Sequence, residues 1–286
     1  MTGLRLHGRF RRGVFAVATT VMVMLRGMGV SLADTGPRPD LWEVWTAHAP
    51  NSTEIVDHSA FDTFLGRYLV MGESGVALVR YGSVSATDKD ALTAYVNQLA
   101  ATSVSALNRD EQMAYWINLY NAATVMLILE HYPTDSILDL PVGGWFSFGP
   151  WGEKILEIEG RDVSLNDIEH RILRPIWKDA RIHYAVNCAS IGCPNLAPQA
   201  FTAENKDRLM DAGAKAYVNH PRGARLVGNK LVVSSIYSWF ESDFTSEDGS
   251  VVAHLLKYAT PQKADELSTV TGVFADDYSW ALNGAP

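Results

Sequence analysis

The sequence has few cysteines and only one long apolar run. Its 286 residues include just two cysteines, Cys188 and Cys193, separated by four residues. A structural zinc site needs about four ligands and usually spaces its cysteines as CxxC, so this pair does not indicate a metal centre. Apart from residues 14–25, no apolar run approaches the roughly 20 residues needed to cross a bilayer. We therefore expect no metal, no cofactor and no membrane-spanning helix in the rest of the chain.

Positive charge is also scarce outside the N-terminus. Residues 1–33 contain five arginines and no acidic residue, which leaves 19 of the 24 Lys and Arg residues against all 32 Asp and Glu, a formal charge of −13. Binding to nucleic acid depends on a positive surface that neutralises phosphates. A nucleic-acid partner is therefore excluded, and a small-molecule or peptide ligand is expected; the oligomeric state is left open.

The first 33 residues follow the order of a secretory signal peptide. Arginines precede the 12-residue apolar run 14–25, and the small-residue pattern Ser31-Leu32-Ala33 precedes Asp34. The alternative is a membrane anchor, but the run is too short and Arg26 interrupts it. We predict cleavage after Ala33 and a periplasmic or secreted protein that has no membrane segment after cleavage.

The remaining pattern predicts an α+β fold with a single compact domain over residues 86–286 and a helical N-terminal extension over residues 34–85. The longest predicted helix covers residues 109–131, where Asn108 and Glu111 form a capping-box pattern. Hairpins are predicted at Glu159-Gly160 and at Gly228-Asn229. A short helix is expected to end at Pro175. The alternating segment 181–187 is predicted to be a buried strand.

Two asparagines accompany the apolar stripe of the long helix. Asn118 and Asn121 lie on a strip beside Trp116, by the 3.6-residue period. Buried amides need hydrogen-bond partners. One interpretation is that they tie down neighbouring loops, and the other is that they face a cleft with Trp116.

The segment "HYAVNCASIGCPNL", residues 183–196, holds both cysteines. In an oxidising compartment a Cys188–Cys193 disulfide would close a small loop. Alternatively, Cys188 is a reactive thiol, because the small residues that follow could leave backbone N–H groups free to stabilise a thiolate or an oxyanion. Strand alternation would place His183 and Cys188 on opposite faces, so they can meet only if the backbone bends between Asn187 and Ala189. Otherwise His170 is a candidate base.

Five segments together resemble a known family. They are "AYWINLYNAATV" (114–125), "VSLNDIEHRILR" (163–174), "RIHYAVNCASIGCPNL" (181–196), "IYSWFESDF" (236–244) and "DYSWALN" (277–283). In this order they resemble the family catalogued as domain of unknown function 547 (DUF547), of the exported bacterial type. The resemblance implies a papain-like or transglutaminase-like fold, in which a nucleophile opens a helix and a histidine lies on a strand. The helix of this chain that carries the resemblance has no cysteine, which departs from that architecture.

Two functions from different classes follow. The first is a thiol-dependent enzyme, similar to a cysteine peptidase or transpeptidase, that transfers or hydrolyses an acyl group of a peptide or amide. Cys188 would be the nucleophile and His183 or His170 the base. Trp116, Asn118, Asn121 and Glu169 would bind substrate in the same cleft. The second is a non-catalytic extracytoplasmic binding module, in which Cys188 and Cys193 form a disulfide.

Overall fold

The long helix expected in the middle of the chain is the centre of the fold. The computed structural model describes residues 36–142 and 149–286; the signal peptide predicted for residues 1–33 lies outside the described residues. Helix α3 (Arg109–His131) begins after Asn108, whose side chain accepts a hydrogen bond from Glu111 N at 3.0 Å. The Glu111 carboxylate accepts from Val56 N at 2.8 Å, so it anchors the preceding segment to the helix. The predicted helix is confirmed in its bounds and its cap.

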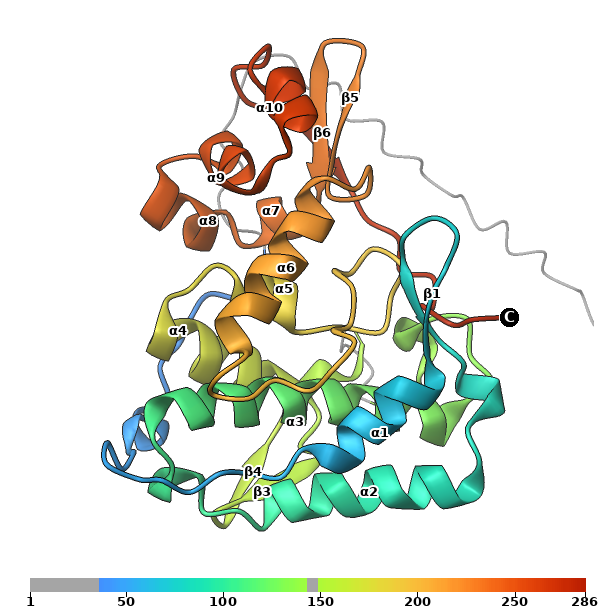
Figure 1. Cartoon of the computed structure of the whole chain (residues 1–286), viewed down its shortest axis with the longest axis vertical. Helices are drawn as coiled ribbons and strands as arrows, with labels where there is room; N and C mark the ends of the chain where they lie inside the picture. Colours follow the sequence, from blue (N-terminus) through green and yellow to red (C-terminus); the bar gives the residue numbers. More distant parts are fainter. Residues whose placement is uncertain (1–35, 143–148) are drawn as a thin grey trace, which may run out of the picture. The chain divides into compact units, whose positions relative to one another are not determined.

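Helices surround α3 on several sides (Figure 1). Residues of α3 are buried around its whole circumference, which identifies it as a core helix and not a surface helix. It packs against α2 (Ala86–Ala100) and against the π-helical segment η6 (Asp167–Leu173). The other helices are α1 (Ser59–Tyr68), α4 (Arg174–Trp177), α5 (Ile182–Ala185), α6 (Lys206–Val218), α7 (Ile236–Trp239), α8 (Glu241–Asp248), α9 (Val251–Tyr258) and α10 (Pro261–Leu267). Short 3₁₀ turns lie at η1 (Glu43–Thr46), η2 (Tyr81–Ser83), η3 (Val104–Ala106), η4 (Ile137–Asp139) and η5 (Pro150–Gly152).

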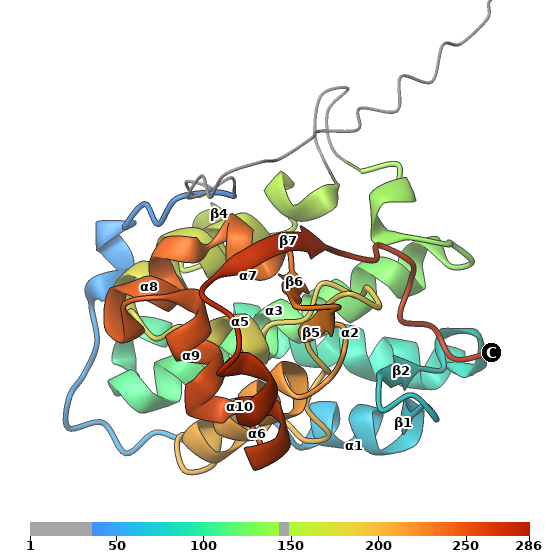
Figure 2. The same cartoon turned by 90° about the horizontal axis from the view of Figure 1, so that it is seen from above.

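The strands of the described residues form three small sheets, which confirms the α+β class. β1 (Leu69–Met71) pairs with β2 (Ala77–Val79), and β3 (Leu156–Ile158) pairs with β4 (Arg161–Val163). The third sheet has the order β5-β6-β7, with β5 (Ala224–Val227) antiparallel and β7 (Val273–Asp277) parallel to β6 (Lys230–Ser234). Both predicted hairpin turns are confirmed; Gly160 and Gly228 have φ of 71° and 64°, which glycine adopts without strain. In Figure 2 the chain leaves β7 and crosses toward β2 and the C-terminus.

The segment 181–187 is not a strand. Residues Ile182–Ala185 form the helical turn α5, and the chain becomes extended only at Val186. Asp179 starts the turn, since its side chain accepts from Arg181 N at 2.8 Å and its carbonyl accepts from Ile182 N at 3.1 Å. A short apolar run cannot be assigned to strand or helix by periodicity alone. Here the turn is buried all round, because it lies between two hydrophobic clusters, and this corrects the prediction.

Two apolar clusters meet at α5. Ile182 and Ala185 belong to the larger cluster around α3, whereas Tyr184 belongs to the cluster formed by α6 to α9 and the β5-β6 hairpin. Helix α6 approaches α5 closely, since a Cβ on Gly213 would lie 2.9 Å from Tyr184 O. The meeting of the two clusters places side chains from distant parts of the sequence around one cavity.

Pro175 lies inside α4 and does not end the helix. Proline has no N–H, so the carbonyls one turn before it lack their helical partner. The carbonyls of His170 and Arg171 instead accept hydrogen bonds at 3.0 Å from Asp40 N and Trp42 N. Residues 36–42 therefore bind along this helix and reach the rim of the cavity.

Candidate functional site

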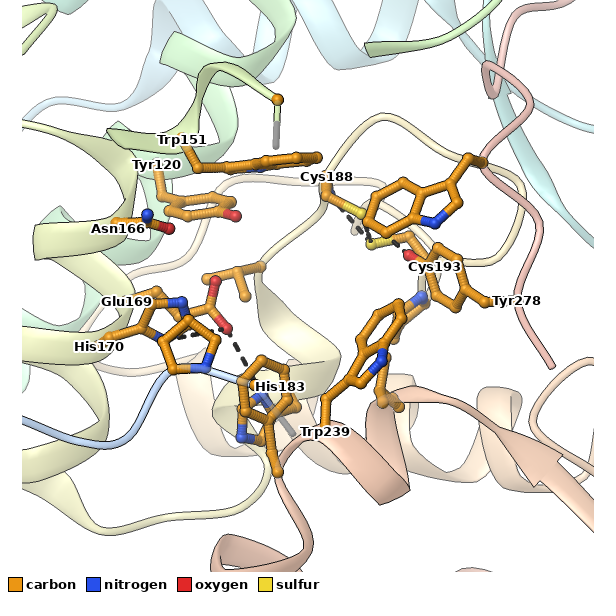
Figure 3. A pocket seen from close by; sticks show the side chains of 18 of the residues that line it. Tyr120, Trp151, Asn166, Glu169, His170, His183, Cys188, Cys193, Trp239 and Tyr278 are labelled. Carbon is orange, nitrogen blue, oxygen red and sulfur yellow. Dashed lines mark hydrogen bonds and ion pairs between the residues drawn. The ribbon is translucent and has the colours of Figure 1, made fainter. Parts of the chain in front are cut away.

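A cavity of about 600 Å³ lies where the two clusters meet. Its walls come from α3, η6, α5, α7, the cysteine segment and the stretch after β7. Cys188 lines one side, and Glu169, His170 and His183 lie across from it (Figure 3). Volumes of this size are typical of sites for small ligands. The cavity is the candidate site within the described part of the chain.

The cysteine segment turns sharply after Asn187. Ala189 adopts φ of 58°, and the Asn187 side chain accepts from Ala189 N at 2.9 Å while donating to Pro194 O at 2.7 Å. One asparagine therefore closes the loop at both ends. The Sγ atoms of Cys188 and Cys193 lie 2.8 Å apart, and both cysteines are free thiols in the structure. The bend required between Asn187 and Ala189 is present, but it brings Cys188 to Cys193 and not to His183.

Four backbone N–H groups of this loop, those of Cys188, Ala189, Ile191 and Gly192, already have partners. Ala189 N donates to Asn187, Ile191 N to Ala281 O at 2.7 Å, and Gly192 N to Ser279 O at 2.8 Å. The amide of Cys188 itself donates to Cys193 Sγ at 3.0 Å. The expectation that these amides are free to bind an oxyanion is wrong for these positions. The reason is the stretch after β7, which packs so closely that a Cβ on Gly192 would lie 2.8 Å from Ser279 O.

The two thiols differ in exposure and in acidity. Cys188 is half-buried and faces the cavity, whereas Cys193 is only 5% exposed. Burial would raise the pKa of Cys188, but hydrogen bonds from Cys193, Ser190 and Tyr278 outweigh it and lower the pKa below its usual range. Burial and the neighbouring Cys188 sulfur raise the pKa of Cys193 far above that range. Of the two sulfurs, the accessible one therefore forms a thiolate more readily.

Tyr278 is the side chain that connects the C-terminal stretch to the thiolate. Its hydroxyl lies 3.0 Å from Cys188 Sγ and 2.9 Å from Ser190 Oγ. Burial and the two sulfurs raise its own pKa well above the ordinary value, so it stays protonated and can donate to the thiolate. Sequence reasoning did not single out Tyr278, although the motif "DYSWALN" contains it.

Tyr278→Phe is expected to lower the reactivity of Cys188 at pH 7 about tenfold, because a hydrogen bond to a charged group contributes roughly 1.5 kcal/mol. The pH profile of alkylation should move to higher pH, since the thiolate then forms only at higher pH. Tyr132→Phe, which removes a hydroxyl from a tyrosine that does not line the cavity, is the control. An unchanged profile in Tyr278→Phe would show that this hydroxyl does not stabilise the thiolate.

His183 is held between two carboxylates. Its Nε2 lies 2.8 Å from Asp243 Oδ2, and its Nδ1 lies 3.6 Å from Glu169 Oε1. Burial would lower its pKa, but the two carboxylates outweigh burial and raise it, so they stabilise the protonated ring. Its ring also stacks on Phe240, with centroids 4.4 Å apart. Both ring nitrogens are therefore engaged, which leaves no free lone pair to accept a proton from Cys188.

At His170 burial outweighs the neighbouring carboxylates, whereas at His183 the carboxylates outweigh burial. Burial, partly offset by Glu169 and reinforced by Arg174, lowers its pKa to about 4. Arg174 lies 3.0 Å from His170 Nδ1, so that nitrogen is the acceptor and Nε2 carries the proton. Among the described residues, no histidine lies within hydrogen-bonding distance of Cys188. The structure thus brings neither predicted base, His183 or His170, to the thiol.

Glu169 completes the polar side of the cavity. Burial would raise its pKa, yet the neighbouring His170, His183 and Arg174 lower it to about 2. Arg174 also binds Asp243 Oδ2 at 2.6 Å and Pro37 O at 2.6 Å. The two carboxylates, Glu169 and Asp243, are thus paired with His183 and with the guanidinium of Arg174. These contacts hold the polar wall rigid.

Three predicted ligand-binding residues lie in the core and not in the cavity. Trp116 is 1% exposed and packs edge-on against Trp45, with ring centroids 5.1 Å apart. Asn118 bonds both the N–H and the C=O of Phe201, at 2.9 and 2.7 Å. Asn121 donates to Ala185 O at 2.9 Å and accepts from Asn187 N at 2.8 Å. The interpretation that Asn118 and Asn121 tie down neighbouring segments is confirmed, whereas the cleft role of all three residues is wrong; Asn121 fixes the residue that precedes Cys188.

The described residues hold neither a candidate metal site nor a candidate membrane span. In residues 36–142 and 149–286, His, Cys, Asp and Glu form no group of three or more suited to a metal ion. Over the same ranges, no helix combines the length and apolarity required to cross a membrane. The chemistry that the described residues offer is that of the cavity and its thiols.

The central part of this arrangement has a family match. Residues 104–218 match the family described as "Protein of unknown function, DUF547". The DUF547 match covers α3, η6, α5, both cysteines and α6. It therefore includes Glu169, His170, His183 and the two thiols, but not Asp243. No curated protein and no solved structure matches the chain. The papain-like or transglutaminase-like architecture implied by the resemblance stays a prediction.

Proposed function

We propose that this DUF547 protein is a thiol–disulfide oxidoreductase whose attacking thiol is Cys188 and whose resolving thiol is Cys193. The observation that carries the proposal is the contact between the two sulfurs, 2.8 Å apart, combined with their opposite properties. The accessible sulfur has the lowered pKa, and the buried one has the raised pKa. Disulfide exchange needs an accessible thiolate and a neighbouring thiol, and it needs no separate base.

The reaction proceeds in two displacements. The Cys188 thiolate attacks one sulfur of a substrate disulfide; a mixed disulfide forms, and the other half of the substrate leaves as a thiolate that takes a proton. Cys193 then loses its proton and attacks Cys188 Sγ, which releases the second half of the substrate. The protein dithiol is oxidised to the Cys188–Cys193 disulfide and the substrate disulfide is reduced to two thiols. An external dithiol restores the starting state.

Acyl transfer or hydrolysis at a peptide or amide is the second candidate. It is favoured by the position of the Cys188 thiolate in the same cavity as Glu169 and His170. It requires in addition a base or acid beside the sulfur and donors for the oxyanion. Neither His170 nor His183 contacts Cys188, and four loop amides already have partners. Disulfide exchange requires neither a histidine nor free amides at the sulfur, so the observed geometry fits it better than acyl transfer.

Export forms part of the proposal. A signal peptide over residues 1–33 would deliver the protein to the periplasm or outside the cell, where disulfide substrates are abundant. In that compartment the Cys188–Cys193 disulfide would be an intermediate of the reaction. The binding-module alternative differs because there the same disulfide would be permanent and only structural.

The trapping experiment uses Cys193→Ser, which lacks the resolving thiol. Incubated with 2-hydroxyethyl disulfide, the reduced variant should accumulate a stable mixed disulfide at Cys188, seen by intact mass and peptide mapping. Reduced wild-type protein should instead end as an internal disulfide with the loss of two hydrogens. An inert Cys188 in both proteins would contradict the proposal and support the binding module. Release of an acyl group from an amide, with no mixed disulfide, would favour acyl transfer.

A further inference from the structure

Arg222 reaches the cysteine segment from the turn between α6 and β5. Its side chain is half-buried and does not line the cavity. Nη1 donates a hydrogen bond to Ile191 O at 2.8 Å, and Nη2 donates to Asn195 Oδ1 at 2.5 Å. These acceptors belong to the second residue before Cys193 and the second residue after it. One guanidinium therefore bridges the backbone turn that carries the buried thiol.

Further contacts fix the same turn. The hydroxyl of Tyr217 donates to Gly192 O at 2.5 Å, and the guanidinium of Arg222 lies 5.4 Å from the centre of the Tyr217 ring. The side-chain oxygen of Asn195 also accepts from Ala77 N at 2.8 Å, which connects the turn to the β1-β2 hairpin. The backbone on both sides of the buried thiol is therefore held by several elements.

The charge of Arg222 has no carboxylate to balance it. Over residues 36–142 and 149–286, its guanidinium forms hydrogen bonds but no ion pair. Burial lowers its pKa, yet a guanidinium stays protonated at neutral pH. A half-buried cation without a counter-ion is costly to retain. The second displacement creates an anion in this place, the Cys193 thiolate, and the guanidinium and that thiolate favour each other's charge.

The other titratable groups that face Cys193 carry no positive charge. Besides the Cys188 sulfur they are Tyr81, Tyr120, Tyr217 and Tyr278. Burial raises the pKa of each tyrosine well above its ordinary value, so the four hydroxyls stay protonated. A carboxylate, Glu169, disfavours charge on Cys188. Of these groups, Arg222 alone is a cation.

From the bridge across Cys193 we propose that Arg222 is the positioning residue of the second displacement. It fixes the backbone around the resolving thiol, and its charge stabilises the thiolate that attacks Cys188 Sγ. In that step Cys193 gives its proton to water and the bond between the two protein sulfurs forms. The bond from Cys188 to the substrate sulfur breaks, and this half of the substrate leaves as a thiolate that takes a proton. The inference deepens the proposed function and rests on it.

The test follows both displacements in reduced full-length protein. Excess 2-hydroxyethyl disulfide is added, samples are quenched with acid over time, and intact mass resolves the dithiol, the mixed disulfide and the internal disulfide. The first displacement is second order, so its rate is taken at low reagent concentration. The reagent is then raised until the second displacement limits, and the rate of that step is measured as a function of pH.

Three variants separate charge from structure. Arg222→Gln keeps an N–H donor for the turn but removes the charge, whereas Arg222→Lys keeps the charge but loses the planar fork. Arg208→Gln, which removes an exposed arginine of α6, is the control. A first displacement as fast as in wild type shows that a variant is folded.

In Arg222→Gln the second displacement should be about tenfold slower at pH 7, and its pH profile should move about one unit higher, because the thiolate loses the charge that stabilises it. The first displacement should be nearly unchanged. Arg222→Lys should recover the pH profile of the wild type, and Arg208→Gln should match the wild type in both steps.

A second displacement with the wild-type rate and pH profile in Arg222→Gln would overturn the inference and leave the proposed function intact. Equal slowing in Arg222→Gln and Arg222→Lys, with no shift of the pH profile, would also overturn it, since the role of Arg222 would then be structural. Wild-type protein that forms neither the mixed nor the internal disulfide would instead refute the proposed function.

Discussion

Cys188→Ser is expected to abolish reduction of 2-hydroxyethyl disulfide, with a loss of at least about 1000-fold. A serine hydroxyl stays protonated at neutral pH and does not attack a disulfide sulfur, whereas a thiolate does. The remaining Cys193 cannot replace it, because it is buried and burial, the largest cause of its raised pKa, persists without the Cys188 sulfur. The measurement is the formation of 2-mercaptoethanol, separated from the reductant by chromatography, under steady-state conditions with excess dithiol.

The matched control is Cys193→Ser, which removes the other sulfur of the pair. This variant should complete the first displacement and release one thiol per protein, but should not turn over unless the external dithiol resolves the mixed disulfide. The two serine variants must therefore differ. If both lost activity equally at the first displacement, or if Cys188→Ser kept a substantial rate, Cys188 would not be the attacking thiol.

Trp116→Ala is expected to destabilise the fold by about 3–5 kcal/mol, the range measured for removal of a large buried aromatic side chain. The indole is 1% exposed and packs against the rings of Trp45 and Tyr115, with centroid separations of 5.1 and 5.0 Å. Because α3 contacts many elements, the cavity left behind cannot easily collapse. The free energy of unfolding, measured from urea denaturation, gives the result.

Trp42→Ala is the comparison for that experiment, since Trp42 is only half-buried and lies on the segment along η6. The decrease in the free energy of unfolding should be clearly smaller in Trp42→Ala than in Trp116→Ala, because Trp42 buries less apolar surface. A loss below about 1 kcal/mol in Trp116→Ala would show that the indole is not part of a packed core.

Local signals in the sequence predicted much of the scaffold. The 3.6-residue stripe and the Asn108 cap determine α3, because cap and stripe act within one helix. The turns at Gly160 and Gly228 follow from the backbone conformations that glycine permits. The bend after Asn187 was named only as the condition for a contact between His183 and Cys188; the Asn187 side chain and Ala189 form it. Each of these features depends on residues close together along the chain.

The composition of the site could not be predicted in the same way. Tyr278 contacts Cys188 across 90 residues, and Asp243 contacts His183 across 60, so neither pairing leaves a local pattern. The segment 181–187 was assigned to a strand because its alternation resembles one, although tertiary packing makes it a helical turn. The buried asparagines Asn118 and Asn121 show the same limit, since their partners are backbone groups of remote segments.

The most direct test of the account is selective alkylation of the two cysteines. Fully reduced wild-type protein is treated with a limiting amount of iodoacetamide at neutral pH, and the label on each cysteine is quantified by peptide mass spectrometry. Because the pKa of Cys188 is lowered and that of Cys193 is raised, Cys188 has the larger thiolate fraction and should carry nearly all of the label. Cys193 should stay unlabelled until the protein is unfolded. Equal labelling, or preferential labelling of Cys193, would contradict the claim that Cys188 is the thiolate of this site.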